Sequence, residues 1–337
     1  MTKRINLALQ GGGAHGAFTW GALDAILDDE RIEVAAISGT SAGALNGAAL
    51  KAGLVKGGRD GARENLAWLW DQVGAQEDGH WDGWLEAWSP RAVSKAIEMS
   101  PPYMIWDMLS RGISPYSTPE FTSQALRRIV ERFDFDDVCT PEGGPRLHVC
   151  ATSVRTGKIR VFEDGEISSD AILASACLPT LFPAVEIDGE AYWDGGYTGN
   201  PALFPLFVND LPRDVLVVNI NPLERAEVPT TAADIQNRIN EISFNTSLLR
   251  ELRAIDFVQR LIHEGTIPEG AMKDVLVHMV ADDGLMRQLS VATKIVPNPA
   301  VIHQLRAAGR GAAERFLSAH FDDLGARSTV DLRAMFA

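Results

Sequence analysis

Ser41 lies between two glycines, in the string Gly39-Thr40-Ser41-Ala42-Gly43, and its hydroxyl could act as a nucleophile. The G-x-S-x-G pattern is typical of an elbow that exposes a serine between a strand and a helix. The elbow glycines Gly39 and Gly43 would remove Cβ atoms that clash across so sharp a turn. The apolar run before Ser41 predicts a strand, and the alanine-rich run after it predicts a helix.

A second candidate is the glycine-rich string at residues 11–16, which follows an apolar strand predicted for residues 5–9. A helical pattern begins directly after it, so its backbone N–H groups would lie at a helix N-terminus and attract an anion. The string lacks the G-x-G-x-x-G register and the P-loop lysine that phosphate binding would require. We therefore favour an oxyanion hole formed by Gly11, Gly12 and Gly13.

A third candidate is Asp194, which opens the string Asp194-Gly195-Gly196 after an apolar strand predicted for residues 190–193. The string alone is a common turn. With the two motifs above, it resembles the patatin-like phospholipase family, whose members carry a glycine-rich oxyanion loop, a G-x-S-x-G serine and a D-G-[GA] aspartate. Residues 174–184 also resemble the stretch before the aspartate in that family, and the resemblance covers about residues 5–220.

The resemblance implies a mechanism and a fold. Ser41 would be the nucleophile of a Ser–Asp dyad, Asp194 would be its base, and an acyl-enzyme would form on a lipid ester without metal or cofactor. The fold would be a three-layer α/β/α sandwich of patatin type with a mostly parallel central sheet. We expect a catalytic domain at residues 1–222, with a tryptophan-rich helical insertion at about 65–117, and a mainly helical extension at 223–337 packed on it.

His15 departs from the family pattern, because the glycine loop of the family usually carries arginine or lysine at this position. A histidine is largely neutral near pH 7, so the positive charge of the loop is in question. Donation by the backbone N–H groups does not depend on this side chain, and we assign no role to His15.

Two alternatives remain open at this stage. One is a Ser-Asp-His triad of the α/β-hydrolase type, for which the sequence offers His263, His278, His303 and His320 after Asp194. His278 lies in an apolar run that predicts a strand, where a histidine is more often a core residue than a catalyst. The other alternative is a catalytically silent regulatory protein with the same fold, although all three motifs are intact.

Composition narrows the classes of partner. The chain has 337 residues, 46% hydrophobic and 23% charged, as is typical of a globular protein. A net charge of −14 argues against nucleic acid and against electrostatic docking to anionic lipid. Three scattered cysteines predict reduced thiols in a cytoplasmic protein. We expect neither a signal peptide nor a membrane span, and leave the oligomeric state open.

Six of the eight tryptophans lie between the elbow and residue 117: Trp68, Trp70, Trp81, Trp84, Trp88 and Trp106. Such side chains could line an acyl groove or contact a membrane surface, and they could equally pack a helical cap. A lid over Ser41 would fit both interpretations, and a transient contact with a lipid surface would follow from it. Farther along, Asp164-Gly165 and Asp188-Gly189 each predict a hairpin turn.

Overall fold

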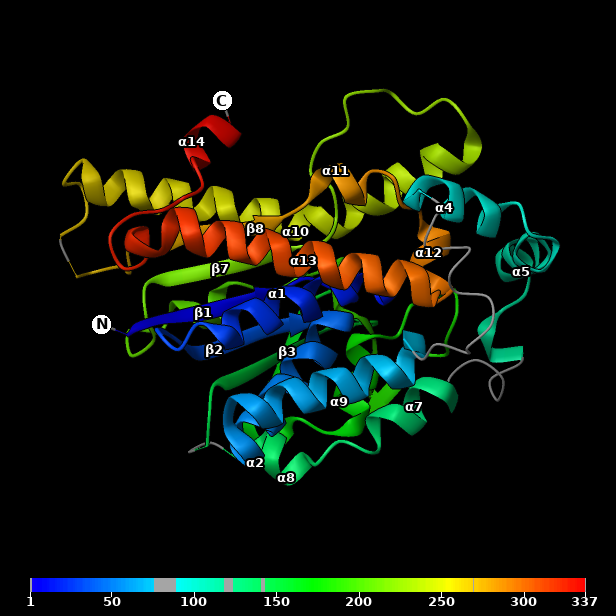
Figure 1. The fold of residues 1–337 in the computed structure, drawn as a ribbon, viewed down its shortest axis with the longest axis horizontal. Coiled ribbons are helices and arrows are strands. Elements are labelled where there is room, and N and C mark those ends of the chain that lie inside the picture. The colour runs from blue at the N-terminus through cyan, green and yellow to red at the C-terminus, as the bar shows by residue number, and fades with distance from the viewer. Residues whose placement is uncertain (1, 76–88, 118–123, 141–142, 269, 337) are drawn as a thin grey trace.

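The computed structural model describes residues 2–75, 89–117, 124–140, 143–268 and 270–336 (Figure 1). A sheet of eight strands lies at its centre, in the order β5-β6-β3-β2-β1-β7-β8, with β4 paired to β3. The strands are β1 (Lys3–Leu9), β2 (Ile32–Thr40), β3 (Arg146–Ser153), β4 (Ile159–Glu163), β5 (Val185–Ile187), β6 (Glu190–Asp194), β7 (Asp214–Asn219) and β8 (Leu276–Ala281).

The centre of the sheet is parallel. Strands β3, β2, β1, β7 and β8 run in one direction, whereas β4 and β6 pair antiparallel with β3, and β5 pairs antiparallel with β6. Parallel strands are covered on both faces and therefore read as continuous apolar runs, as residues 215–218 of β7 do. The expected α/β fold with a mostly parallel sheet is confirmed.

Helices cover both faces, because alternate side chains of a strand point to opposite sides. On β1, Leu7 and Leu9 belong to one hydrophobic core and Ala8 to another. Helices α1 (Ala17–Asp28), α2 (Ala42–Trp70), α9 (Ser169–Ser175) and α13 (Pro299–His320) contribute to the first core. Helices α10 (Ala232–His263) and α14 (Leu332–Met335) contribute to the second, which completes the three layers (Figure 1).

Shorter helices flank this sandwich. They are α4 (Pro90–Glu98), α5 (Pro101–Gly112), α7 (Gln124–Val130), α8 (Phe135–Cys139), α11 (Asp283–Met286) and α12 (Val291–Ile295). The residues after 222 form helices and also one strand, β8, which extends the central sheet beside β7. Every helix in the described part of the chain is too short or too polar to span a bilayer.

Of the two predicted hairpins, one is confirmed and one is wrong. Strands β5 and β6 pair around Asp188-Gly189 as expected. Asp164-Gly165 instead begins a short 3-10 helix, Asp164–Glu166, because the Glu163 and Glu166 side chains cap this turn reciprocally. The chain then continues into α9, so no second hairpin strand follows β4.

The tryptophan-rich insertion is described only in part. Trp81, Trp84 and Trp88 lie outside the described residues. Trp70 stacks on Trp20 with ring centroids 6.2 Å apart, and Trp68 meets Phe133 edge-on at 5.7 Å. These two tryptophans therefore pack within the fold.

Candidate active site

Ser41 occupies a strained elbow between β2 and α2. Its backbone φ is 54° and ψ is −121°, and a positive φ is unusual for a residue with a Cβ atom. The Ser41 N–H donates to Ser175 Oγ at 2.9 Å, and this hydroxyl donates to the Cys150 carbonyl at 2.6 Å. The elbow is thus fastened to α9 and, through Ser175, to β3.

The elbow glycines lie where the chain leaves no space for a side chain. A Cβ atom at Gly39 would lie 2.6 Å from the Gly43 carbonyl oxygen, across the turn. At Gly43 it would lie 2.1 Å from the Leu9 carbonyl oxygen, at the end of β1. The turn of the elbow therefore packs directly on the strand that leads into the glycine loop.

Strand register brings Asp194 to the same place. Thr40 on β2 pairs with Cys150 on β3, and the next residue of β3, Ala151, pairs with Asp194 at the end of β6. Gly195 permits this approach, because a Cβ atom there would lie 2.1 Å from the Cys150 carbonyl oxygen. Ser41 and Asp194, far apart in sequence, thus meet beside the end of β3.

The Asp194 carboxyl is buried, with 1% of the residue exposed. Oδ1 accepts the Gly196 N–H at 2.7 Å, whereas the buried Oδ2 has no well-aligned donor among the described residues. Burial raises the pKa of Asp194 to about 7, and hydrogen bonding from Gly196 and the Ser41 side chain opposes that rise. The Ser41 side chain is therefore close enough to act on the carboxyl.

The three glycines of the loop are not equivalent. The Gly11 N–H donates to Asn200 Oδ1 at 2.6 Å, so it is engaged within the protein. Among the described residues, the N–H groups of Gly12 and Gly13 have no acceptor. Gly11 also lies against the elbow, because a Cβ atom there would be 2.8 Å from Ser41 Cβ. The glycine that touches the elbow is thus followed by two residues whose N–H groups have no acceptor in the described part of the chain.

Three buried amide side chains hold the loop, and the sequence reasoning missed them. Gln10 Oε1 accepts from the Ile220 and Asn221 N–H groups, at 2.9 and 3.1 Å. Asn221 Nδ2 donates to the Gly11 carbonyl at 2.9 Å. Asn200, as described above, accepts the Gly11 N–H. A lone polar residue after a strand gives no periodic signal, so these partners emerge only from the fold.

His15 points away from this chemistry. Its Nε2 lies 2.8 Å from Thr293 Oγ1, whose single proton is donated to the Ser290 carbonyl, so His15 Nε2 carries the hydrogen of that pair. Burial and, to a lesser extent, Lys294 hold the pKa of His15 well below its usual value. The imidazole is therefore neutral near pH 7.

Three of the four histidines that a Ser-Asp-His triad could use lie beside carboxylates other than Asp194. His278 Nε2 lies 2.9 Å from Asp214, His320 Nδ1 lies 2.8 Å from Asp323, and His263 Nε2 lies 3.9 Å from Asp274. His303 is a residue of α13. Within the described ranges, no group of three or more His, Cys, Asp or Glu side chains could hold a metal ion.

The sheet and the helices on its two faces define an α/β protein in which the strained Ser41 elbow, Gly11 of the glycine loop and Asp194 lie together. The family model described as patatin-like phospholipase matches residues 7–207, and the chain belongs to this family. Membership supports lipid acyl hydrolase activity in general terms.

Solved structures resemble the chain at low sequence identity. A structure of VipD from Legionella pneumophila has 16% identity and a TM-score of 0.47, over 95% of this chain and 68% of that one. The ExoU–SpcU complex from the type III secretion system of Pseudomonas aeruginosa has 16% identity and a TM-score of 0.30, over 99% and 74%. No curated protein matches the chain.

Proposed function

We propose that the protein hydrolyses carboxylic ester bonds of phospholipids or related lipids through a Ser41–Asp194 dyad. The observation that supports this most is the buried Asp194 carboxyl beside the strained Ser41, with a pKa raised by burial to about 7. A carboxylate of ordinary pKa is a weak base for an alcohol, and one near 7 is a better base at neutral pH.

In the proposed reaction, Asp194 takes the Ser41 hydroxyl proton as Oγ attacks the ester carbonyl carbon. The carbonyl oxygen becomes an oxyanion, which the N–H groups of Gly12 and Gly13 would stabilise, with the N-terminus of α2 adding positive potential. The leaving alcohol takes the proton from Asp194, and an acyl-enzyme remains on Ser41. Asp194 then deprotonates a water, which releases the fatty acid and restores Ser41.

The experiment compares wild type with Ser41→Ala on p-nitrophenyl butyrate and on phosphatidylcholine vesicles, using the full chain. We expect kcat/KM to fall at least about a thousandfold, and a fluorophosphonate to label Ser41 in the wild type. Ser114→Ala, an exposed serine near α5, is the matched control and should retain activity. Hydrolysis that survives Ser41→Ala would overturn the proposal, and a folded wild type without hydrolysis or labelling would favour a silent regulatory protein.

We also propose transient contact with a lipid surface. Its support is a set of large exposed apolar side chains directly after α4, on α5 and on α10: Met99, Met104, Ile105, Ile235 and Ile239. Figure 1 places α4, α5 and the N-terminal part of α10 at one end of the molecule. Sedimentation with neutral vesicles, compared between wild type and Met104→Lys, tests the contact with a lipid surface.

We further propose a cytoplasmic location, because the three cysteines are free thiols.

A further inference from the structure

Lys294, on α12, lies against the back of the glycine loop. A Cβ atom at Gly13 would be 2.3 Å from the Lys294 carbonyl oxygen, so the two backbones touch. The Lys294 ammonium group donates to Asn221 Oδ1 at 2.6 Å. Lys294 stands well beyond residues 7–207, so the family match does not include it.

Asn221 connects this ammonium to the loop. Its Oδ1 accepts from Lys294, and its Nδ2 donates to the Gly11 carbonyl at 2.9 Å. The orientation of the amide is fixed by chemistry, because an ammonium group can only donate and a carbonyl can only accept. The Gly11 carbonyl belongs to the same peptide group as the Gly12 N–H. An ammonium, a side-chain amide and a peptide group therefore stand in series, and the series ends on the Gly12 N–H, for which the described residues offer no acceptor.

Hydrogen bonds in series polarise one another, and more strongly in a buried environment. An ammonium at the head of the series withdraws electron density from each amide in turn, which makes the Gly12 N–H a stronger donor. We propose that Lys294 is a positioning residue for the oxyanion hole, which polarises the Gly11–Gly12 peptide group through Asn221. This inference rests on the proposed function of the glycine loop.

Lys294 supplies a charge that His15 does not. The two residues line one pocket with Glu241, and Lys294 is the only lysine or arginine among the residues lining it. His15 is neutral near pH 7, because burial holds its pKa low. In this chain the cation behind the loop comes from α12 instead.

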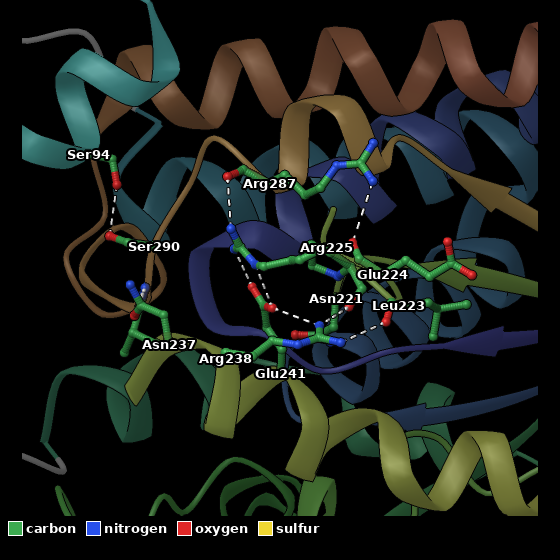
Figure 2. Close-up of polar contacts among 12 residues, drawn as sticks. Ser94, Asn221, Leu223, Glu224, Arg225, Asn237, Arg238, Glu241, Arg287 and Ser290 are labelled. Atoms are coloured by element: carbon green, nitrogen blue, oxygen red, sulfur yellow. Dashed lines mark hydrogen bonds and ion pairs between the residues drawn. The ribbon is translucent and has the colours of Figure 1, made fainter. Parts of the chain in front are cut away.

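The groups around Lys294 set the pKa of its ammonium group only slightly above neutral pH. Glu241, on α10, is buried and held by Arg225 at 2.5 Å and Arg238 at 3.2 Å, as Figure 2 shows. Arg225 also reaches the Arg287 carbonyl at 3.4 Å. Burial lowers the pKa of Lys294 to about 8, the Glu241 carboxylate opposes this, and the Arg225 guanidinium adds to it. Lys294 should thus lose its proton just above neutral pH.

The test measures kcat and KM on a soluble ester between pH 6 and 10. Lys294→Met should lower kcat about tenfold with little change in KM, a smaller loss than the 10²–10³-fold expected on deleting an oxyanion donor. Lys294→Arg, which keeps a charge, should retain most of kcat and move the fall in activity from pH about 8 to beyond pH 10. Asn221→Leu combined with Lys294→Met should cost no more than Asn221→Leu alone, because both break one series.

Lys273→Met is the matched control. The pKa of Lys273 is also lowered by burial to about 8, but its ammonium donates to carbonyls at residues 206–211, ahead of β7. This variant should keep the wild-type fall in activity above pH 8.

Lys294 variants that keep the wild-type kcat and the wild-type fall in activity above pH 8 would overturn the inference, provided that hydrolysis still depends on Ser41. If Lys294→Met does not fold, the pH profiles of wild type and Lys294→Arg decide the question. Absence of Ser41-dependent hydrolysis in the wild type would overturn the proposed function instead.

Discussion

Asp194→Asn should stabilise the protein at the pH where it abolishes activity. The substitution keeps an oxygen to accept the Gly196 N–H and removes a charge that is buried in the native state. Because burial raises the native pKa of this carboxyl to about 7, the native state holds the proton more tightly than the unfolded chain does.

The magnitude follows from the two pKa values. A rise from 3.8 to about 7 is about 3 units, or at most about 4 kcal/mol at 1.36 kcal/mol per unit. Below pH 3.8 the carboxyl is neutral in both states and carries no penalty. The penalty grows as the pH rises between the two values and is complete above pH 7. The asparagine variant carries none of it, so its advantage over wild type should grow by about 2–3 kcal/mol between pH 5 and pH 8.

Urea unfolding of both proteins at pH 5, 6, 7 and 8, with refolding verified by dilution, measures the difference in the free energy of unfolding. Asp188→Asn is the control, because it removes the same charge from an exposed turn and should show no such trend. A difference between Asp194→Asn and wild type that stays constant from pH 5 to 8 would refute the reasoning, since the carboxyl would then ionise as it does in the unfolded chain.

Two further predictions concern the same site. The kcat/KM of the wild type should fall about tenfold for each pH unit below about 7, because only ionised Asp194 can accept the Ser41 proton; a level profile from pH 5 to 7 would contradict this. Ser175→Ala should lower the free energy of unfolding by about 1–3 kcal/mol and slow fluorophosphonate labelling of Ser41, because it leaves the buried Ser41 N–H without its acceptor. Thermal unfolding and a labelling time course check the second.

The sequence predicts the local half of the site well. The elbow is specified by an apolar run, two glycines and a helical run within about 20 residues, and the structure has β2, Ser41 and α2 there. Asp188-Gly189 likewise forms its hairpin. At Asp164-Gly165 the same turn signal is overridden by the Glu163 and Glu166 side chains, which cap a 3-10 turn instead.

The supporting half of the site is not predictable in this way. Asn200 and Asn221 contact Gly11 across 189 and 210 residues of sequence. Single amides in loops carry neither periodicity nor a motif, and their partners are fixed by which strands become neighbours. The same holds for the Gly11 N–H, which the glycine pattern alone predicts as an oxyanion donor and which the structure shows bonded to Asn200.

The pairing of β1 with β7 has a consequence for any attempt to isolate or transplant the family-matched segment. The match ends at residue 207, whereas β7 begins at Asp214. A piece cut at that limit would turn β1 into an exposed sheet edge and would deprive Gln10 of the Ile220 and Asn221 amides. The motifs would all be present, yet the loop that carries them would have lost its scaffold on one side. The smallest portable unit of this protein is therefore set by strand adjacency and not by the span of its recognisable motifs.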